Sequence, residues 1–542
     1  MTSASNNGKR ALGVIAGSAA FALVLAGCAS TPGDDGGNSA DSIIVGTTDK
    51  VTFIDPAGSY DNGSFAIMNQ VYPFLLNSPS GTSDVEPDIA ASAEFTTPTE
   101  YTVVLKEGLT FANGNELTSS DVKFSFDRQL AIADENGPSV LLYNLASVEA
   151  VDDLTIVFTL KAGNDQIWPQ ILSSPAAPIV DEDVFAADAV TPDADIVKGK
   201  AFAGQYEISS YDFNNLVEFT AFDGYDGVLG APATDTVQLQ YFTEASNLKL
   251  AVQEGEIDVA HRSLSATDVA DLEGNDDVNV VVGPGGETRY IVFNFDTQPF
   301  GAKTPEADEA KALAVRQAVA NLVDRDELSD QVYKGTYLPL YSFVPAGLTG
   351  ATEVLKELYG TDGKPDAAKA EKALADAGVT TPVELNLQYN PDHYGESSGD
   401  EYALVKSQLE KDGLFTVSLQ STEWVQYSKD RTADVYPAYQ LGWFPDYSDA
   451  DNYLSPFFAE GNFLGNHYSN AEVNTMIGAQ AVETDPAKRQ TLIEDIQAAV
   501  AADLSTVPLL QGSQIAVTGK TVTGATLDGS FKFRYGTLAK GE

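Results

Sequence analysis

Few residues of this chain have a spacing that could carry out chemistry, and the clearest pattern is Gly-Glu-Ser-Ser-Gly at residues 395–399. Such a pattern is typical of the nucleophilic serine of a hydrolase, which lies at a sharp turn directly after a strand. Here residues 390–394 separate it from a strand that we expect to end near Tyr389. Only His467 follows in the chain order that this class of hydrolase requires. We therefore do not expect a serine hydrolase.

Groups that could bind metal or phosphate also lack the required spacing. The three histidines are His261, His393 and His467. They are far apart in the sequence and form no zinc motif. Three nearby aspartates, Asp446, Asp449 and Asp451, could offer oxygens to calcium, but the glycine and the distal glutamate of an EF-hand loop are missing. No Walker A sequence is present. We expect no enzymatic activity, cofactor or metal, and any ATP hydrolysis would belong to a partner subunit.

The charge of the chain excludes one class of partner. Its 79 acidic and 31 basic residues give a formal net charge of −48. Such a charge repels nucleic-acid phosphates and anionic lipid headgroups. We therefore expect no nucleic-acid binding, and we attribute the acidic surface to solubility rather than to ligand choice.

The amino terminus has the pattern of a secretory signal peptide over residues 1–27. Two basic residues, Lys9 and Arg10, precede an apolar stretch from Ala11 to Ala26. That stretch is shorter than the roughly 20 residues of a membrane-spanning helix. It ends in Leu-Ala-Gly-Cys, which resembles the lipobox of bacterial lipoproteins and predicts a lipid on Cys28. An ordinary signal peptide is the alternative.

The segment after the signal peptide, residues 28–41, is polar and glycine-rich and predicts a flexible tether. Cys28 is the only cysteine, so no internal disulfide can form and stability must come from the hydrophobic core. The length of 542 residues suggests two to four compact parts at about 100–200 residues each.

Strands and helices alternate along the rest of the chain. Apolar and polar residues alternate over residues 101–106 and 154–160, which predicts two half-buried strands. Thr118 with Asp121 predicts a capped helix start between them. Farther on, a strand is expected over residues 383–389, and further helices are expected to begin after Asp324 and after Asp485. These elements predict a mixed α/β protein.

Segments in a common order from residue 43 to residue 449 resemble the family 5 extracellular solute-binding proteins. This family includes oligopeptide-, dipeptide- and nickel-binding components of ABC importers. The matching segments are residues 43–48, 53–57, 71–75, 105–114, 117–122, 255–258, 315–319, 324–325 and 442–449. Among them, residues 105–122 are the most diagnostic.

The resemblance implies an α/β, three-lobed fold like that of type II periplasmic binding proteins, with mixed sheets. It assigns residues 42–78, 200–286 and 505–542 to a discontinuous lobe I, residues 79–199 to an inserted lobe II, and residues 287–504 to lobe III. The ligand cleft would lie between the first two lobes and the third, which would close by a hinge motion.

The same resemblance points to one segment of the cleft. In peptide-binding relatives the aspartate of a Trp-x-x-Asp-Tyr segment accepts the ammonium group of the ligand, and position by position this residue is Asp446. A carboxylate in a closed, water-poor cleft forms strong charge-assisted hydrogen bonds with an ammonium. Trp443 and Tyr447 would supply flat, rigid contact area. The alternatives are a loop packed on the core and a calcium site.

Other cleft residues are expected near the first strand and near residue 260. Arg262 could pair with a peptide carboxylate, although most arginines are surface or structural residues. Thr48, Asp49, Tyr60 and Asn62 follow the first expected strand, where relatives line the cleft.

We therefore predict an extracytoplasmic substrate-binding component of an ABC transporter that delivers a short peptide to the permease and its ATPase subunits. It would be a monomer, anchored through Cys28 to the outer face of the cytoplasmic membrane. A binder of an oligosaccharide, an opine or a metal chelate is one alternative, because a fold does not fix function. A surface sensing or interaction protein without a transport role is another.

Overall fold

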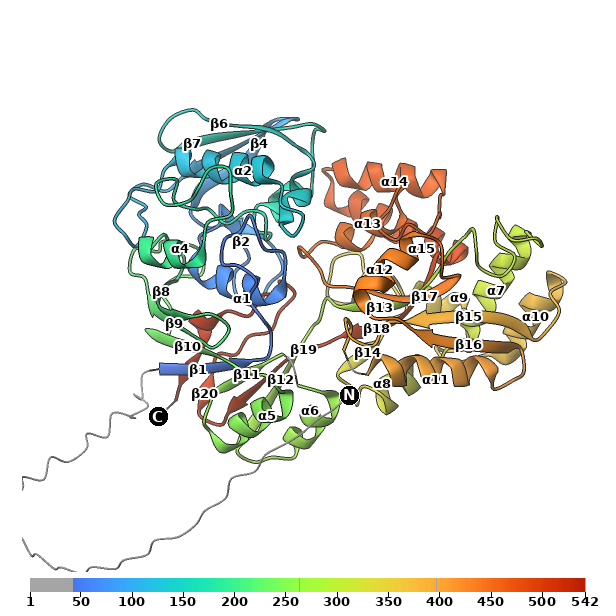
Figure 1. Cartoon of the computed structure of the whole chain (residues 1–542). Helices are drawn as coiled ribbons and strands as arrows, with labels where there is room; N and C mark the ends of the chain where they lie inside the picture. The colour runs from blue at the N-terminus through green and yellow to red at the C-terminus, as the bar shows by residue number, and fades with distance from the viewer. Residues whose placement is uncertain (1–41, 263, 396, 542) are drawn as a thin grey trace, which may run out of the picture. The chain divides into compact units, whose positions relative to one another are not determined.

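The described residues form three sheets of four or more strands and two two-stranded sheets, and the larger sheets can be followed in Figure 1. The computed structural model describes residues 42–262, 264–395 and 397–541, and these belong to one compact unit. The expected signal peptide, Cys28 and the tether lie outside the described residues.

The first sheet has seven strands in the order β12-β19-β11-β1-β10-β9-β8. Its strands are β1 (Ser42–Thr47), β8 (Tyr206–Asp212), β9 (Leu216–Ala221), β10 (Thr236–Tyr241), β11 (Val259–His261), β12 (Val278–Gly283) and β19 (Gln514–Gly519). β1 pairs in parallel with β10 and β11, so the amino-terminal strand is central in the sheet. The associated helices are α1 (Asn62–Val71), α4 (Asp193–Gly199), α5 (Ala245–Glu254) and α6 (Ala266–Glu273).

The second sheet has four antiparallel strands in the order β4-β5-β7-β6. They are β4 (Ala90–Thr97), β5 (Glu100–Leu105), β6 (Leu145–Ala150) and β7 (Thr155–Leu160). β5 and β7 confirm the two predicted strands. Helix α2 (Ser119–Ile132) packs on β6 and β7, and it begins with the predicted capping box of Thr118 and Asp121. Smaller elements nearby are β2 (Leu76–Asn77), β3 (Glu86–Pro87), η1 (Pro138–Leu142) and α3 (Trp168–Ile171).

The third sheet has six strands in the order β14-β18-β13-β17-β15-β16. They are β13 (Thr288–Phe293), β14 (Tyr337–Pro339), β15 (Val383–Tyr389), β16 (Phe415–Ser421), β17 (Ala438–Trp443) and β18 (Thr506–Gly512). Its helices are α7 (Glu309–Leu322), α8 (Arg325–Gln331), α9 (Val354–Leu358), α10 (Ala367–Asp376), α11 (Ser398–Glu410), α12 (Trp424–Thr432), α13 (Ser455–Phe458), α14 (Ala471–Val482) and α15 (Pro486–Asp503). The predicted N-caps Asp324 and Asp485 both accept backbone hydrogen bonds, which confirms these two helix starts.

The chain connects the seven-stranded and six-stranded sheets at residues 284–287 and again at Ser513. These two connections touch. A Cβ atom on Gly285 would lie 1.5 Å from the carbonyl oxygen of Gly512, so only glycine fits there. The second connection also divides the expected lobe I segment 505–542, because β18 belongs to the six-stranded sheet and β19 to the seven-stranded sheet. Residues 506–512, which were predicted to belong to lobe I, therefore lie in the same sheet as β13 to β17 of the predicted lobe III.

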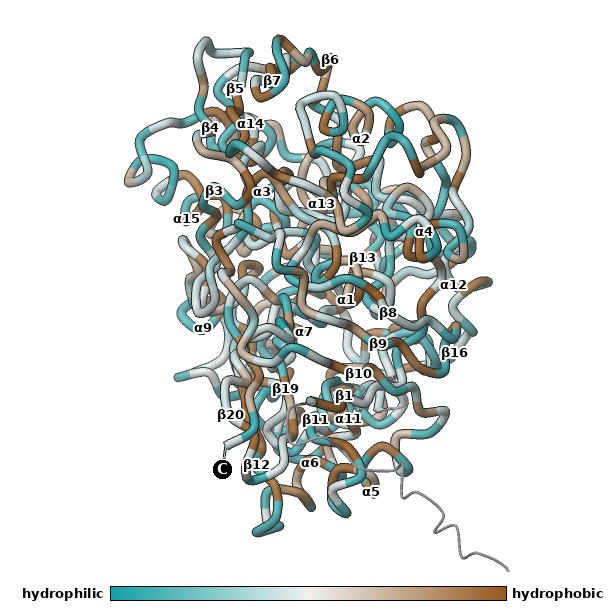
Figure 2. Tube along the Cα trace, turned by 90° about the vertical axis from the view of Figure 1, so that its left-hand side faces the viewer, coloured by the Kyte–Doolittle hydropathy of each residue, from teal (hydrophilic) through white to brown (hydrophobic). Residues whose placement is uncertain are grey.

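The carboxyl-terminal residues carry β20 (Val522–Thr523), β21 (Ala539–Lys540) and η3 (Tyr535–Thr537), and η2 (Ala450–Tyr453) follows β17. Hydrophobic and hydrophilic residues alternate in short stretches along the chain (Figure 2). Of the helices in the described ranges, none combines the length and apolar character needed to cross a membrane.

Candidate ligand-binding cavity

A cavity of about 940 Å³ lies where segments from several parts of the sequence meet. Its walls come from the end of β1, helix α1, the turn after β11, the connection between β12 and β13, the segment before α11, the turn after β17, and residues 512–515 and 530–535. This volume is within the range of sites that enclose small molecules. The described part of the chain therefore contains a space suited to a small ligand.

Asp446 lies in the wall of this cavity, in the turn that follows β17. One carboxylate oxygen accepts a hydrogen bond from the Tyr60 hydroxyl, and the other accepts from Asn452 Nδ2 at 3.0 Å. Burial raises the pKa of the Asp446 carboxyl, although both hydrogen bonds act in the opposite direction. No lysine or arginine of the described residues forms an ion pair with it.

The aromatic residues predicted with Asp446 have different positions. Tyr447 lines the cavity, and its hydroxyl donates to Asp451 Oδ2 at 3.2 Å. Trp443 is not part of the lining, which differs from the prediction. Its indole Nε1 donates to Asn452 Oδ1 at 2.8 Å, so the side chain stabilises the loop that follows β17 and does not line the cavity.

Tyr60 also lies outside the lining residues, yet its hydroxyl reaches Asp446. The contact joins the segment before α1 to the turn after β17. Burial and the nearby Asp446 carboxylate raise the pKa of Tyr60, so the hydroxyl stays protonated and donates to the carboxylate.

The three aspartates considered for calcium do not converge on one ion. Asp449 accepts two hydrogen bonds from Arg489, at 2.7 and 2.8 Å. Asp451 is buried and bonded to Tyr447 and Gln480. Within the described ranges, the oxygens of Asp446, Asp449 and Asp451 do not gather closely enough for a shared cation.

Arg262, Thr48, Asp49 and Asn62 all line the cavity, so the structure brings these predicted residues together. The Arg262 Nε atom lies 2.9 Å from Asp49 Oδ2, and the Asp49 charge raises the pKa of the guanidinium. Its positive charge is therefore already compensated. A peptide carboxylate would have to compete with Asp49 for this arginine.

Two basic residues of the wall were not predicted from the sequence. Arg289 is buried and paired with Glu287 at 3.0 Å and with Glu401 at 3.1 Å. Lys532 is also buried, and burial lowers the pKa of its ammonium group. The sequence signal was residues 531–535, where two basic residues alternate with aromatic ones in a chain poor in basic residues.

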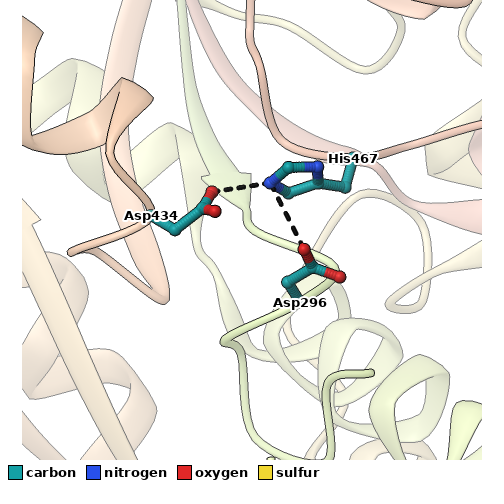
Figure 3. Close-up of side chains that lie close together, drawn as sticks. All are labelled: Asp296, Asp434 and His467. Atoms are coloured by element: carbon teal, nitrogen blue, oxygen red, sulfur yellow. Dashed lines mark hydrogen bonds and ion pairs between the residues drawn. The ribbon is translucent and has the colours of Figure 1, made fainter. Parts of the chain in front are cut away.

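His467 lies in a separate cluster with Asp296 and Asp434 (Figure 3). Its Nε2 atom is 2.6 Å from Asp434 Oδ1 and 3.4 Å from Asp296 Oδ2. None of the three lines the cavity, whereas Ser397 does. Lys303 Nζ lies 2.7 Å from Asp296 and offsets one of the two carboxylate charges of the cluster. The cluster therefore does not supply a histidine to the Gly-Glu-Ser-Ser-Gly loop.

Comparison with known sequences identifies relatives over nearly the whole chain. The glutathione-binding protein GsiB of Shigella dysenteriae is 24% identical over 510 residues, which cover 90% of this chain and 92% of that protein. Heme-binding protein A of Haemophilus influenzae is 26% identical over 546 residues, covering 93% and 95%.

Solved structures show the same fold. The ABC transporter substrate-binding protein CtaP of Listeria monocytogenes aligns with a TM-score of 0.77 at 23% identity, covering 92% of this chain and 99% of that one. The DppA protein of Helicobacter pylori, in complex with the peptide STSA, aligns with a TM-score of 0.73 at 19% identity, covering 92% and 98%. These likenesses confirm the predicted α/β fold of type II periplasmic binding proteins.

The predicted family is confirmed by a match between most of the sequence and a known protein family. Residues 84–465 match the family described as bacterial extracellular solute-binding proteins, family 5 middle. The matched part includes β4 to β17 and the cavity residue Asp446. The chain belongs to the family 5 bacterial extracellular solute-binding proteins, a family that binds substrates.

Proposed function

We propose that this protein captures a short peptide in its cavity and delivers it to the permease of an ABC importer. The observation that carries the proposal is the Asp446 carboxylate, which faces the cavity and has no cationic partner among the described residues. A peptide's amino-terminal ammonium would supply that missing charge.

The hydrogen-bonding capacity of Asp446 supports this role. An ionised carboxylate offers about four acceptor positions. Tyr60 and Asn452 each use one of these positions, so the group can accept further hydrogen bonds from an ammonium. Such charge-assisted bonds are strong in a site that excludes water.

The rest of the wall suits the main chain and side chains of a peptide. Phe65, Phe444, Tyr447, Phe531 and Phe533 present aromatic surface to the cavity. Relatives with the same fold support the ligand class: DppA was solved with the peptide STSA, and a Pseudoalteromonas dipeptide-binding protein was solved with Met-Leu.

Thermal unfolding with mixed di- to pentapeptides tests the proposal on protein first freed of ligand by unfolding and refolding. A ligand at 100 times its Kd stabilises the folded state by about 2.7 kcal/mol, which raises Tm measurably. We expect free peptides to raise Tm, and N-acetylated peptides and the Asp446→Asn variant to lose the effect. The exposed Asp412→Asn variant is the matched control and should respond as the wild type does. If no peptide raises Tm, the proposal is wrong.

We further propose that Cys28 carries the lipid that holds the protein on the outer face of the cytoplasmic membrane. The support is the lipobox-like sequence and the membership in an extracellular family. Mass spectrometry of the membrane-bound protein should find a diacylglycerol on Cys28, and a Cys28→Ser variant should be lost from the membrane fraction. Retention of the unmodified variant in that fraction would contradict the anchor.

A further inference from the structure

Lys532 is a basic residue of the cavity wall whose hydrogen-bond partners among the described residues are neutral. Its side chain is buried, with 8% of the residue exposed. The Nζ atom donates to the carbonyl oxygen of Ser173 at 2.7 Å and to Asn77 Oδ1 at 3.2 Å. An ammonium has three donors, so one remains after these two bonds.

The other basic side chains of the wall are compensated by carboxylates. Arg262 pairs with Asp49 at 2.9 Å, and Arg289 pairs with Glu287 at 3.0 Å. Lys532 forms no ion pair with any of the described residues. Because a buried charge without a counter-charge is costly, burial lowers the pKa of the Lys532 ammonium, and an anion beside it in the cavity would stabilise its charged form.

The surroundings of Lys532 add further unused donors. Arg534, two residues on, is 4% exposed and donates through Nη2 to the carbonyl oxygen of Ser78 at 2.5 Å. Its Nε and Nη1 atoms are buried and have no hydrogen-bond partner in the described part of the chain. Lys532 in the cavity wall, and Arg534 buried two residues further on, therefore have hydrogen-bond donors that the described residues leave unused.

The two carboxylates whose charges act on Lys532 and Arg534, Asp88 and Asp528, accept hydrogen bonds from other residues. Asp88 accepts hydrogen bonds from the Tyr225 hydroxyl at 2.5 Å and from the Val228 backbone at 2.9 Å. Asp528 accepts from the backbone nitrogens of Gly81 at 2.7 Å and Ser530 at 2.9 Å. Neither forms an ion pair with Lys532, so neither would compete with a ligand carboxylate for the lysine.

We infer that Lys532 binds the terminal carboxylate of the ligand, with Arg534 reinforcing the positive potential behind it. This inference rests on the proposed peptide-binding function and narrows it. Asp446 and Lys532 then bind the opposite charges of a zwitterionic peptide, and Arg262 remains paired with Asp49. The cavity thus selects peptides whose two ends are both free.

The test compares peptide pools as free acids and as carboxyl-terminal amides, with binding measured by calorimetry. We expect amidation to weaken binding to the wild type by at least about tenfold, as for loss of a buried charge pair. The Lys532→Met variant should bind acids and amides equally, whereas the exposed Lys520→Met control should keep the preference for acids. Amidated pools rich in Asp and Glu should bind as weakly as other amides, since the site takes the terminal carboxylate.

Several results would overturn the inference. Equal binding of acids and amides to the wild type would contradict it while leaving peptide binding intact, and so would an acid preference that persists in folded Lys532→Met. Strong binding of the acidic amides would assign the site to a side-chain carboxylate instead. The Lys532→Arg variant, which keeps the charge, should retain the preference even if the methionine variant folds poorly. Failure of every free peptide to bind would refute the proposed function itself.

Discussion

At the scale of single residues, the protonation of Asp446 should make both the stability of the protein and its affinity for a peptide depend on pH. Its pKa is raised by burial, so the carboxyl takes up a proton at a higher pH than an exposed aspartate does. The folded state then binds this proton more tightly than the unfolded state. The contribution of Asp446 to the stability of the ligand-free protein therefore decreases as the pH rises through its folded-state pKa.

The affinity for a peptide ammonium should change in the opposite direction. Only the ionised carboxylate pairs with a cation, so we expect calorimetry to show weaker peptide binding as the pH falls through the raised pKa of Asp446. The Asp446→Asn variant should bind weakly at every pH of the series. An affinity of the wild type that stays constant between neutral and acid pH would contradict the proposed role of this carboxylate.

A second residue-scale prediction concerns Glu401, a buried partner of the cavity residue Arg289. Its Oε2 atom accepts hydrogen bonds from Arg289 Nη1 at 3.1 Å and from the Tyr333 hydroxyl at 2.7 Å. Removing Glu401 leaves Arg289 paired with Glu287 but takes away a buried acceptor of Arg289 and Tyr333, so Glu401→Ala should lower the free energy of unfolding by about 1–3 kcal/mol. Urea denaturation measures this loss. An effect no larger than that of an exposed Glu→Ala change would show that the pair contributes little.

At the scale of elements, one buried pair joins the turn after β1 to helix α2. Arg128 donates to the two carboxylate oxygens of Asp55 at 2.8 and 2.5 Å, and both side chains are almost fully buried. Asp55 Oδ2 also accepts from the Thr191 backbone at 2.6 Å. The pair therefore couples the seven-stranded-sheet part of the chain to the helix that packs on the four-stranded sheet.

We expect Arg128→Met to lower the free energy of unfolding by about 3–5 kcal/mol, because it leaves the Asp55 carboxylate buried without its cation. Lys123 in the same helix is the matched control, since its ion pair with Asp127 is exposed. Exposed pairs contribute little, so Lys123→Met should change stability only slightly in the same urea titration. Equal effects of the two changes would contradict the structural role of the buried pair.

At the scale of the whole molecule, we propose that the two connections between the seven- and six-stranded sheets act as a hinge. The Gly512 nitrogen donates to the Glu287 carbonyl oxygen at 2.8 Å, and Gln511 Nε2 donates to the Gly285 carbonyl oxygen at 2.8 Å. Any change in the angle between the two sheets must pass through these adjacent segments.

Gly285→Ala should disturb this region, because the new Cβ would overlap backbone atoms of Gly512 and Ser513. We expect this variant to have a lower Tm than the wild type. When peptide binds, small-angle scattering should detect compaction of the wild type but not of the variant. Gly478→Ala is the control, since this glycine lies in α14 with open space around it. Alanine at that helical position should be neutral or stabilising. Wild-type behaviour of Gly285→Ala would contradict a hinge at this position.

The sequence by itself determined the local elements and the family. Thr118 with Asp121 and Asp485 with Pro486 define helix starts because a cap depends on residues within about four positions. The strand over residues 383–389 was likewise predictable from its alternation of apolar and polar residues. The order of motifs predicted the family, and the resemblance pointed to Asp446, which lines the cavity.

Only the tertiary structure decided which charges in the cavity are compensated. The sequence left open whether Arg262 meets a ligand carboxylate or has a structural role, and the structure pairs it with Asp49. Lys532 was not predicted, and its uncompensated charge becomes evident only where it meets Asn77, which is 455 positions away in the sequence. Trp443 turned out to support the loop through Asn452 rather than to line the cavity. Pairing and burial depend on contacts between distant segments, and local spacing carries no information about those contacts.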